Sequence, residues 1–95
     1  MPVVIKPYSY FEGAVQSLEF HIDDGTRATV GVIARGGDWD FGVANRSEQI
    51  TVTSGRITGV DQKVYRTGDT LVFKKGEHIR FNTAGPVSYL CRYGK

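Results

Sequence analysis

Hydrophobic and polar residues alternate along this chain in short runs separated by glycine-rich or acidic turns. Within residues 15–22, Leu18, Phe20 and Ile22 alternate with polar residues, which is the period of a strand with one buried face. Turn signals recur at intervals of roughly 6 to 12 residues, and no stretch has a helical period of useful length. The strands predicted in this way are residues 15–22, 27–34, 39–43, 48–53, 56–60, 70–73, 79–82 and 87–93, with a short extended segment at 64–66.

About nine short strands and no significant helix predict an all-β domain, either a sandwich or a barrel. Closure into a barrel removes exposed strand edges, so we expect one small jelly-roll-like β-barrel over residues 10–95. Residues 1–9 are interpreted as an N-terminal arm, because Pro2 and Pro7 exclude a helix and leave at most pairing along a sheet edge.

Two local signals refine this picture. Asp23-Asp24-Gly25 predicts a hairpin turn between the first two strands. Gly31, in the middle of the second strand, predicts either a β-bulge or a close approach to the backbone.

The segment E-Q-I-T-V-T-S-G, from Glu48 to Gly55, places a carboxylate at the start of an alternating strand. Glu48 shares a strand face with Ile50 and Val52, so its carboxylate is expected to point toward the apolar side of the sheet. A buried carboxylate is unfavourable unless it is paired, hydrogen-bonded or bound to a ligand, so function is expected around Glu48. The alternative is that Glu48 lies at the strand edge with its carboxylate in solvent.

Composition excludes several classes of protein. The chain has 95 residues, which is one domain with one core. A net charge of +2, with scattered lysines and arginines, gives no support for nucleic-acid binding. A single cysteine excludes an internal disulfide and suits a reducing compartment. The first residues, M-P-V-V-I-K-P-Y, are too short in apolar positions for a signal peptide or membrane span, so we expect a cytoplasmic protein.

Two glycine-anchored segments resemble the two halves of the cupin signature. The first is Glu48 followed by Gly55, and the second runs from Gly68 through Gly76 and His78 to Asn82. A metal-binding cupin carries H-x-H shortly before its glutamate, where this chain reads F-G-V-A-N-R-S. Lys74 stands where the second half of the cupin signature has a proline. His78 lies one residue before the position of the usual histidine ligand. Because a divalent metal site needs about three converging ligands, we expect no metal and no cofactor.

A more specific resemblance emerges when the flanking segments are added. They are Y-F-E-G-A-V-Q-S-L from Tyr10, T-V-G-V-I from Thr29, W-D-F from Trp39, E-Q-I-T-V-T-S-G from Glu48 and S-Y-L-C-R-Y from Ser88. In this order the chain resembles the small cupin-like pyrimidine/purine nucleoside phosphorylases, from Tyr10 to Tyr93. The resemblance implies broad-specificity phosphorolysis: a nucleoside and inorganic phosphate, as co-substrate, give a free base and pentose 1-phosphate.

The residues suit such a reaction, because the phosphate itself is the nucleophile and no catalytic triad is needed. The protein must hold a dianion, orient the ribose hydroxyls and stabilise the departing base. Glu48 is the candidate to accept hydrogen bonds from ribose hydroxyls, and His78 is a second candidate catalytic residue. Arg27, Arg80 and Arg92 are the candidates for phosphate, because a guanidinium can meet two oxygens at once.

Aromatic side chains are the candidates for base binding. Phe41, Tyr89 and Tyr10 can contact any base through a ring face without reading its edge, which would tolerate many substrates. On the last strand, however, Tyr89 and Arg92 have opposite parity, so both point inward only if a bulge interrupts the strand. The competing structural interpretations are a solvated Arg92, a buried filler at Cys91, a turn residue at His78, a surface residue at His21 and a core residue at Phe41.

The sequence therefore predicts a metal-independent nucleoside phosphorylase acting on purine and pyrimidine nucleosides. The alternatives are a non-catalytic cupin that binds a small ligand and, with less support, a metal-dependent cupin isomerase or oxygenase. The expected partners are nucleosides, phosphate and a second copy of the chain, with residues 3–5 of the arm contributing to a homodimer.

Overall fold

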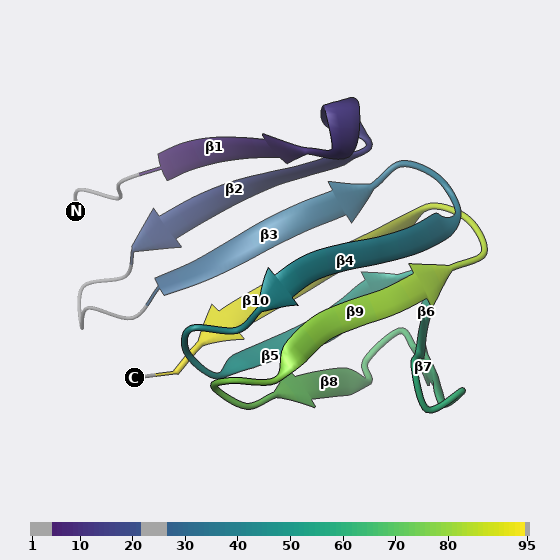
Figure 1. The fold of residues 1–95 in the computed structure, drawn as a ribbon. Coiled ribbons are helices and arrows are strands. Elements are labelled where there is room, and N and C mark those ends of the chain that lie inside the picture. The colour runs from purple at the N-terminus through teal and green to yellow at the C-terminus, as the bar shows by residue number, and fades with distance from the viewer. Residues whose placement is uncertain (1–4, 22–26, 95) are drawn as a thin grey trace.

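The computed structural model describes residues 5–21 and 27–94, which form two β-sheets (Figure 1). A single-turn 3-10 helix, η1 (Phe11–Gly13), follows the first strand. The strands in the described residues are β1 (Ile5–Tyr10), β2 (Val15–His21), β3 (Arg27–Ile33), β4 (Gly37–Val43), β5 (Glu48–Ser54), β6 (Arg56–Gly59), β7 (Val64–Arg66), β8 (Thr70–Phe73), β9 (His78–Thr83) and β10 (Val87–Tyr93).

The strands form two antiparallel sheets. The larger has the order β1-β2-β3-β10-β5-β8 and the smaller the order β4-β9-β6-β7. The last strand, β10, thus lies between β3 and β5, which brings the end of the chain to the middle of the larger sheet. The all-β fold class expected from the sequence is confirmed, as a β-sandwich.

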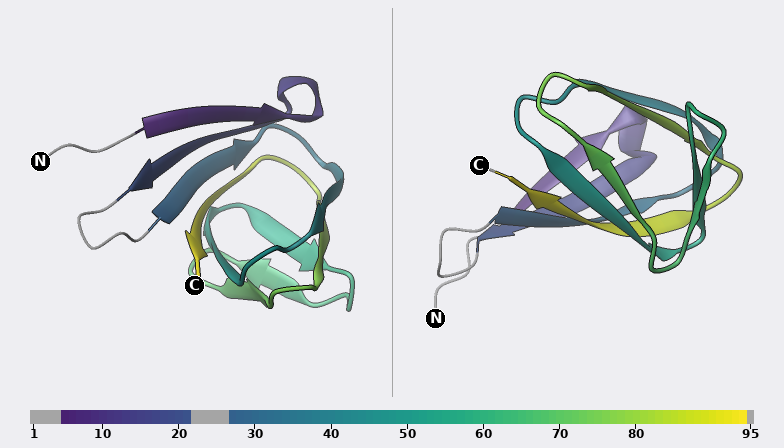
Figure 2. Two further views of the ribbon diagram at one scale, coloured as in Figure 1. Left: turned by 60° about the vertical axis from the view of Figure 1, so that its left-hand side comes forward. Right: turned by 90° about the horizontal axis from the view of Figure 1, so that it is seen from below.

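The two sheets do not close into a continuous barrel. Among the described residues, each strand pairs only with strands of its own sheet. The larger sheet has two more strands than the smaller, and its β1–β2 end extends past the smaller sheet (Figure 2). Pro7 in β1 suits that edge, because proline offers no N–H for a further strand to pair with.

Strand boundaries agree with the alternation pattern to within two residues, the largest difference being that β4 begins at Gly37 rather than Trp39. Residues 5–9, interpreted as part of an arm, belong to β1, which pairs with β2. The expected contribution of residues 3 and 4, and the hairpin turn at 23–25, lie outside the described residues. In the described part of the chain, no helix is long and apolar enough to span a membrane.

The core lies between the sheets and follows the strand register. In β5, Ile50 and Val52 are buried while Gln49 and Thr53 are exposed, as the sequence predicted. Burying each large apolar side chain contributes about 1.5–3 kcal/mol to folding. The largest fully buried side chains are Trp39, Ile33, Ile57, Val15, Val52 and Val87.

Gly31 is the site of a close approach, one of the two alternatives predicted for it. It pairs with Tyr89 across the β3–β10 ladder. A Cβ at position 31 would overlap the Tyr89 ring, lying 2.8 Å from its Cε1 atom. The missing side chain therefore makes room for Tyr89 over the inner face of the larger sheet.

Candidate functional site

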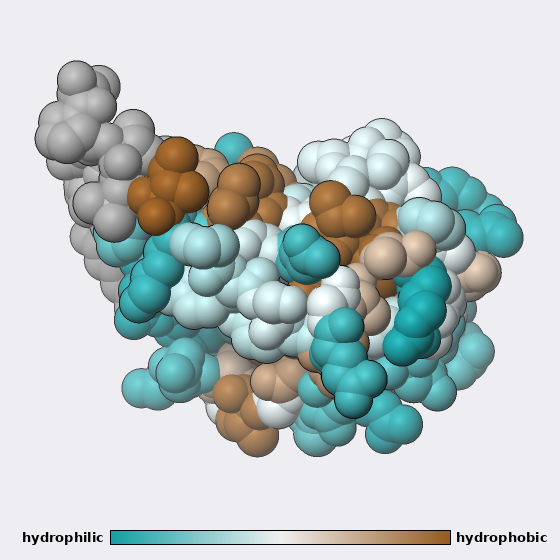
Figure 3. Space-filling model, turned by 90° about the horizontal axis from the view of Figure 1, so that it is seen from above, coloured by the Kyte–Doolittle hydropathy of each residue, from teal (hydrophilic) through white to brown (hydrophobic). Residues whose placement is uncertain are grey.

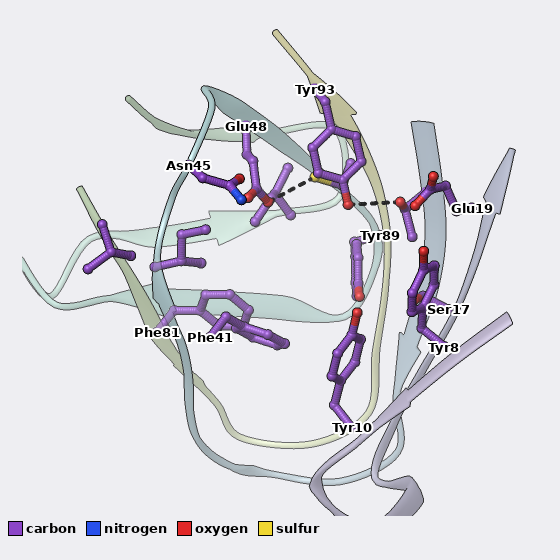
Figure 4. Close-up of a pocket in the computed structure, with 15 residues that line it drawn as sticks. Tyr8, Tyr10, Ser17, Glu19, Phe41, Asn45, Glu48, Phe81, Tyr89 and Tyr93 are labelled. Carbon is purple, nitrogen blue, oxygen red and sulfur yellow. Dashed lines mark hydrogen bonds between the residues drawn. The ribbon is translucent and has the colours of Figure 1, made fainter. Parts of the chain in front are cut away.

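A cavity of about 260 Å³ lies between the sheets and is lined mainly by β1, β2, β4, β5, β9 and β10 (Figure 4). Its size is close to the lower end of the range for small-ligand pockets, about 300–1,000 Å³. The lining residues are Tyr8, Tyr10, Ser17, Glu19, Thr29, Phe41, Val43, Asn45, Glu48, Ile50, Ile79, Phe81, Tyr89, Cys91 and Tyr93.

Glu48 projects into this cavity from the first position of β5, as its shared face with Ile50 and Val52 predicted. Its Oε1 atom accepts a hydrogen bond from the Cys91 thiol on the neighbouring strand, with a sulfur–oxygen distance of 3.4 Å. Burial raises the pKa of Glu48, while the Cys91 bond and the positive charge of Arg46 oppose that rise. Glu48 is therefore a half-buried acid whose carboxyl group faces a cavity.

Three side chains of β10 line the same cavity because they alternate along the strand. Tyr89, Cys91 and Tyr93 face inward, and the hydroxyl of Tyr93 is 2.8 Å from the hydroxyl of Thr29. Burial is the largest cause that raises the pKa of each of the three groups, so they are neutral near pH 7. At that pH they offer O–H and S–H groups rather than charges.

Aromatic rings form the wall opposite β10. Phe41 makes edge-to-face contacts with Tyr10 and Phe11, at centroid distances of 6.2 and 5.4 Å, and a tilted contact with Phe81 at 5.6 Å. In Figure 4 the hydroxyls of Tyr10 and Tyr89 point toward one another across the cavity. The pKa of Tyr10 is raised, chiefly by burial. The cavity thus combines an apolar aromatic side with a hydroxyl-rich side.

Four sequence-predicted site residues meet in the cavity: Glu48, Phe41, Tyr89 and Tyr10. His78 does not line it. Its side chain is 54% exposed on β9, with Nε2 2.6 Å from Asp40 Oδ1, and this hydrogen bond lowers the pKa of Asp40.

The three candidate arginines are also outside the cavity lining. Arg80 and Arg92 are exposed on β9 and β10. The bulge at Ser88/Tyr89, in the pairing of β10 with β5, leaves Arg92 on the face opposite Tyr89. Arg27 is adjacent to the cavity, because its Nη1 lies 3.4 Å from Oε1 of the lining residue Glu19.

Sequence reasoning did not identify Tyr8, Ser17, Glu19, Asn45 and Tyr93 as site residues. The parity of β10 already placed Tyr93 on the same face as Tyr89, so that signal was present. Ser17 and Glu19 share the face of β2 that carries the buried Val15, whereas the expected core face of β2 was that of Leu18 and Phe20.

The donor set of the cavity does not fit a metal site. Among residues 5–21 and 27–94, no group of three or more His, Cys, Asp or Glu side chains is placed to hold a metal ion. The cavity contains Glu19, Glu48 and Cys91, and the thiol pKa is raised by burial, whereas a metal ligand must be a thiolate.

A family model described as pyrimidine/purine nucleoside phosphorylase matches residues 5–93 of this chain. The chain belongs to that family. The match confirms the resemblance found in the sequence and extends it from Tyr10 back to Ile5, the first residue of β1. The residues matched by the pyrimidine/purine nucleoside phosphorylase family model thus include both sheets and every residue that lines the cavity.

Solved structures share the fold of this nucleoside phosphorylase family member. A protein of unknown function from Vibrio parahaemolyticus is 29% identical, with a TM-score of 0.82, and the match covers 94% of this chain and 97% of that one. A protein of unknown function from Acinetobacter sp. ADP1 is 23% identical, with a TM-score of 0.79 and coverages of 98% and 93%.

Two further solved structures share the fold at lower identity, and one of them is described as cupin-like, as the sequence predicted for this chain. A structure reported for DMSP lyases is 19% identical over 98% of this chain and 57% of that one, with a TM-score of 0.77. A protein with a cupin-like fold from Ralstonia eutropha has a TM-score of 0.67 at 14% identity, over 85% of this chain and 56% of that one. At these identities the likeness concerns the fold alone.

Proposed function

We propose that this protein is a broad-specificity nucleoside phosphorylase whose active site is the cavity around Glu48. The observation that carries the proposal is the family match over residues 5–93, which includes every residue of the cavity lining. The lining supports it chemically, because a half-buried carboxyl group, neutral hydroxyls and aromatic rings are the groups that a nucleoside needs.

In this proposal Glu48 binds the ribose. The Cys91 thiol donates a hydrogen bond to Oε1 of the Glu48 carboxylate and so orients it. The remaining lone pairs can accept hydrogen bonds from the 2′ and 3′ hydroxyls, which are donors. The base then lies against the rings of Phe41 and Phe81, with the hydroxyls of Tyr10 and Tyr89 nearby. Ring faces do not read base edges, which would allow purines and pyrimidines in one site.

The reaction is a displacement at C1′ of the ribose. An oxygen of hydrogen phosphate forms the new bond to C1′, and the bond from C1′ to the base nitrogen breaks with its electron pair leaving on the base. The proton of hydrogen phosphate ends on that base, so atoms and charge balance. The protein contributes by orienting the two reactants and by stabilising the oxocarbenium-like charge at C1′, for which the nearby Glu48 carboxylate is suited.

We propose that no metal takes part, since the reaction needs a positioned anion rather than an activated water. Prolonged chelation should then leave turnover unchanged. A stoichiometric transition metal in the purified protein, whose removal abolishes turnover and whose return restores it, would contradict this part of the proposal.

The decisive experiment is a chromatographic assay of purified protein with inosine and with uridine, with and without phosphate. We expect hypoxanthine and uracil to appear only when phosphate is present, together with pentose 1-phosphate. Equal release without phosphate would identify a hydrolase. No release from any nucleoside, together with ligand-dependent stabilisation, would favour the non-catalytic binding cupin.

A further inference from the structure

Two side chains that can carry positive charge contact one carboxylate oxygen at the edge of the cavity. His21 Nε2 lies 3.2 Å and Arg27 Nη1 lies 3.4 Å from Oε1 of Glu19. The Glu19 side chain is only 12% exposed and lines the cavity, whereas those of His21 and Arg27 are 42% and 34% exposed. A nearly buried anion is thus held between two donors that remain open to solvent.

The direction of these hydrogen bonds follows from the chemistry of the groups. An ionised carboxylate can only accept, so Nε2 of His21 carries the proton that it shares with Glu19. The guanidinium of Arg27 can only donate. Both donors therefore point at a single oxygen anion, and a phosphate oxygen could take its place.

The cavity interior offers no comparable place for an anion. In the described residues that line it, the charged side chains are Glu19 and Glu48, with no lysine or arginine. Two carboxylates repel a dianion, so the phosphate must meet its positive charge at the rim. The guanidinium of Arg27 is 5.7 Å from the ring centroid of Tyr93, and Figure 4 shows Tyr93 between Glu19 and Glu48.

We propose that Arg27 and His21 form the phosphate subsite, and that Glu19 occupies it as an internal anion until phosphate displaces its carboxylate. The inference rests on the proposed phosphorylase function. It places the attacking phosphate on the Tyr93 side of the ribose that Glu48 binds. It also selects Arg27 as the phosphate ligand from the three candidate arginines. It also gives His21, interpreted from the sequence as plain surface, a binding role.

The proposal predicts effects of opposite sign within one cluster. Glu19→Gln keeps the size of the side chain but removes the competing charge, so the KM for phosphate should fall several-fold. Arg27→Gln and His21→Gln replace the guanidinium and imidazole donors by an uncharged amide, so the KM for phosphate should rise, by about tenfold or more for Arg27. In all three variants the KM for phosphate should change by more than the KM for the nucleoside. Arg56→Gln, an exposed arginine on β6, is the matched control.

Phosphate binding measured without nucleoside, by calorimetry and by thermal melting, separates this inference from the phosphorylase assignment. Weaker binding in Arg27→Gln and tighter binding in Glu19→Gln would support the subsite even if no nucleoside were cleaved. An active enzyme whose phosphate KM is unchanged in Arg27→Gln, or raised only in Arg80→Gln or Arg92→Gln, would overturn it. A Glu19→Gln variant that folds normally but binds phosphate less tightly would overturn the displacement by phosphate.

Discussion

Three properties of its surroundings define the carboxyl group of Glu48. It is half-buried, it faces a cavity, and one of its oxygens is held by the neutral thiol of Cys91. A thiol is a weak donor and compensates only part of the lost hydration, so burial still disfavours the ionised carboxylate. Ribose hydroxyls would supply the missing donors, which couples ligand binding to the protonation state of this residue.

Replacing Glu48 by glutamine tests its proposed role at constant size. A charge-assisted hydrogen bond contributes about 1.5–3 kcal/mol, so kcat/KM should fall by roughly one to two orders of magnitude. The melting temperature should be unchanged or higher, because an amide is easier to bury than a carboxylate. Glu12→Gln, an exposed glutamate, is the control. A loss of several kcal/mol in stability would instead mark Glu48 as the structural partner of a cation.

The raised pKa of Glu48 predicts how activity and stability depend on pH. The folded protein binds the proton of the Glu48 carboxyl group more tightly than the unfolded chain does. Ionisation of Glu48 therefore lowers the free energy of unfolding at pH values above its folded pKa. That penalty disappears as the pH falls toward the ordinary glutamate value of about 4.3. The stability advantage of Glu48→Gln should therefore be largest at neutral pH and shrink as the pH falls.

The same titration should appear in the kinetics. Because the ionised form accepts the ribose hydroxyls, kcat/KM should decline as the pH falls through the raised pKa, with a midpoint above about 4.3. A pH profile of kcat/KM, with melting curves at each pH, gives both readings. A wild-type profile without an acid limb above that value would contradict the ionised role of Glu48.

At the scale of the strands, β3 and β10 determine the shape of the cavity together. The two are paired in register, with Gly31 opposite Tyr89, and the ring lies where a side chain of residue 31 would otherwise be. Tyr89 thus depends on a glycine that is distant in sequence. Because Gly31 has no side chain, the Tyr89 ring can lie over β3 without a steric clash.

Gly31→Ala should displace the Tyr89 ring. Overpacking of this kind costs typically about 1–3 kcal/mol, so the melting temperature should fall, and the moved hydroxyl should raise the KM for nucleosides. Thermal melts and steady-state kinetics measure the two effects. Val30→Ala changes the neighbouring, outward-facing position of β3 and should leave the nucleoside KM unchanged. A Gly31→Ala variant with normal stability and normal KM would show that the ring adjusts freely.

At the scale of the whole molecule, the outer face of β2 and β3 is apolar and open. Leu18, Val30 and Val32 are 45%, 42% and 53% exposed, and apolar patches are visible beside the β1–β2 end in Figure 3. Leu18, Val30 and Leu90 lie side by side across three strands. Among residues 5–21 and 27–94, those that line the groove along this face carry no charge, and the groove shares Tyr8, Ser17 and Tyr89 with the cavity.

We propose that a second copy of the chain covers this face. An uncharged, apolar surface is complementary to itself, which is the requirement of a two-fold dimer interface. The wild-type protein should then be a dimer by light scattering at micromolar concentration, and Val32→Glu should yield folded monomers. Val60→Glu, at an exposed position after β6, is the control. A monomeric wild type, or a Val32→Glu variant that remains dimeric, would contradict this interface.

The strands from residue 15 onward, the face that Glu48 shares with Ile50 and Val52, and the family follow from the sequence alone, whereas β1 was interpreted as part of an arm. Alternation with period two is a local property, and it places Glu48 with Ile50 and Val52 without knowledge of any partner strand. The ends of the strands are equally local, because turn residues mark them. The family segments depend on the order of residues along the chain, which needs no structure.

Which side chains meet depends on the packing and register of the folded chain. His78 follows the cupin spacing, yet it lies on the exposed side of β9, because spacing along a strand does not say which face is covered. Glu19, His21 and Arg27 form one cluster only because β2 and β3 pair in register. The sheets remain a sandwich because, among the described residues, the strands of one sheet do not pair with those of the other. Such contacts arise between residues distant in sequence, where a one-residue change of register would alter every neighbour.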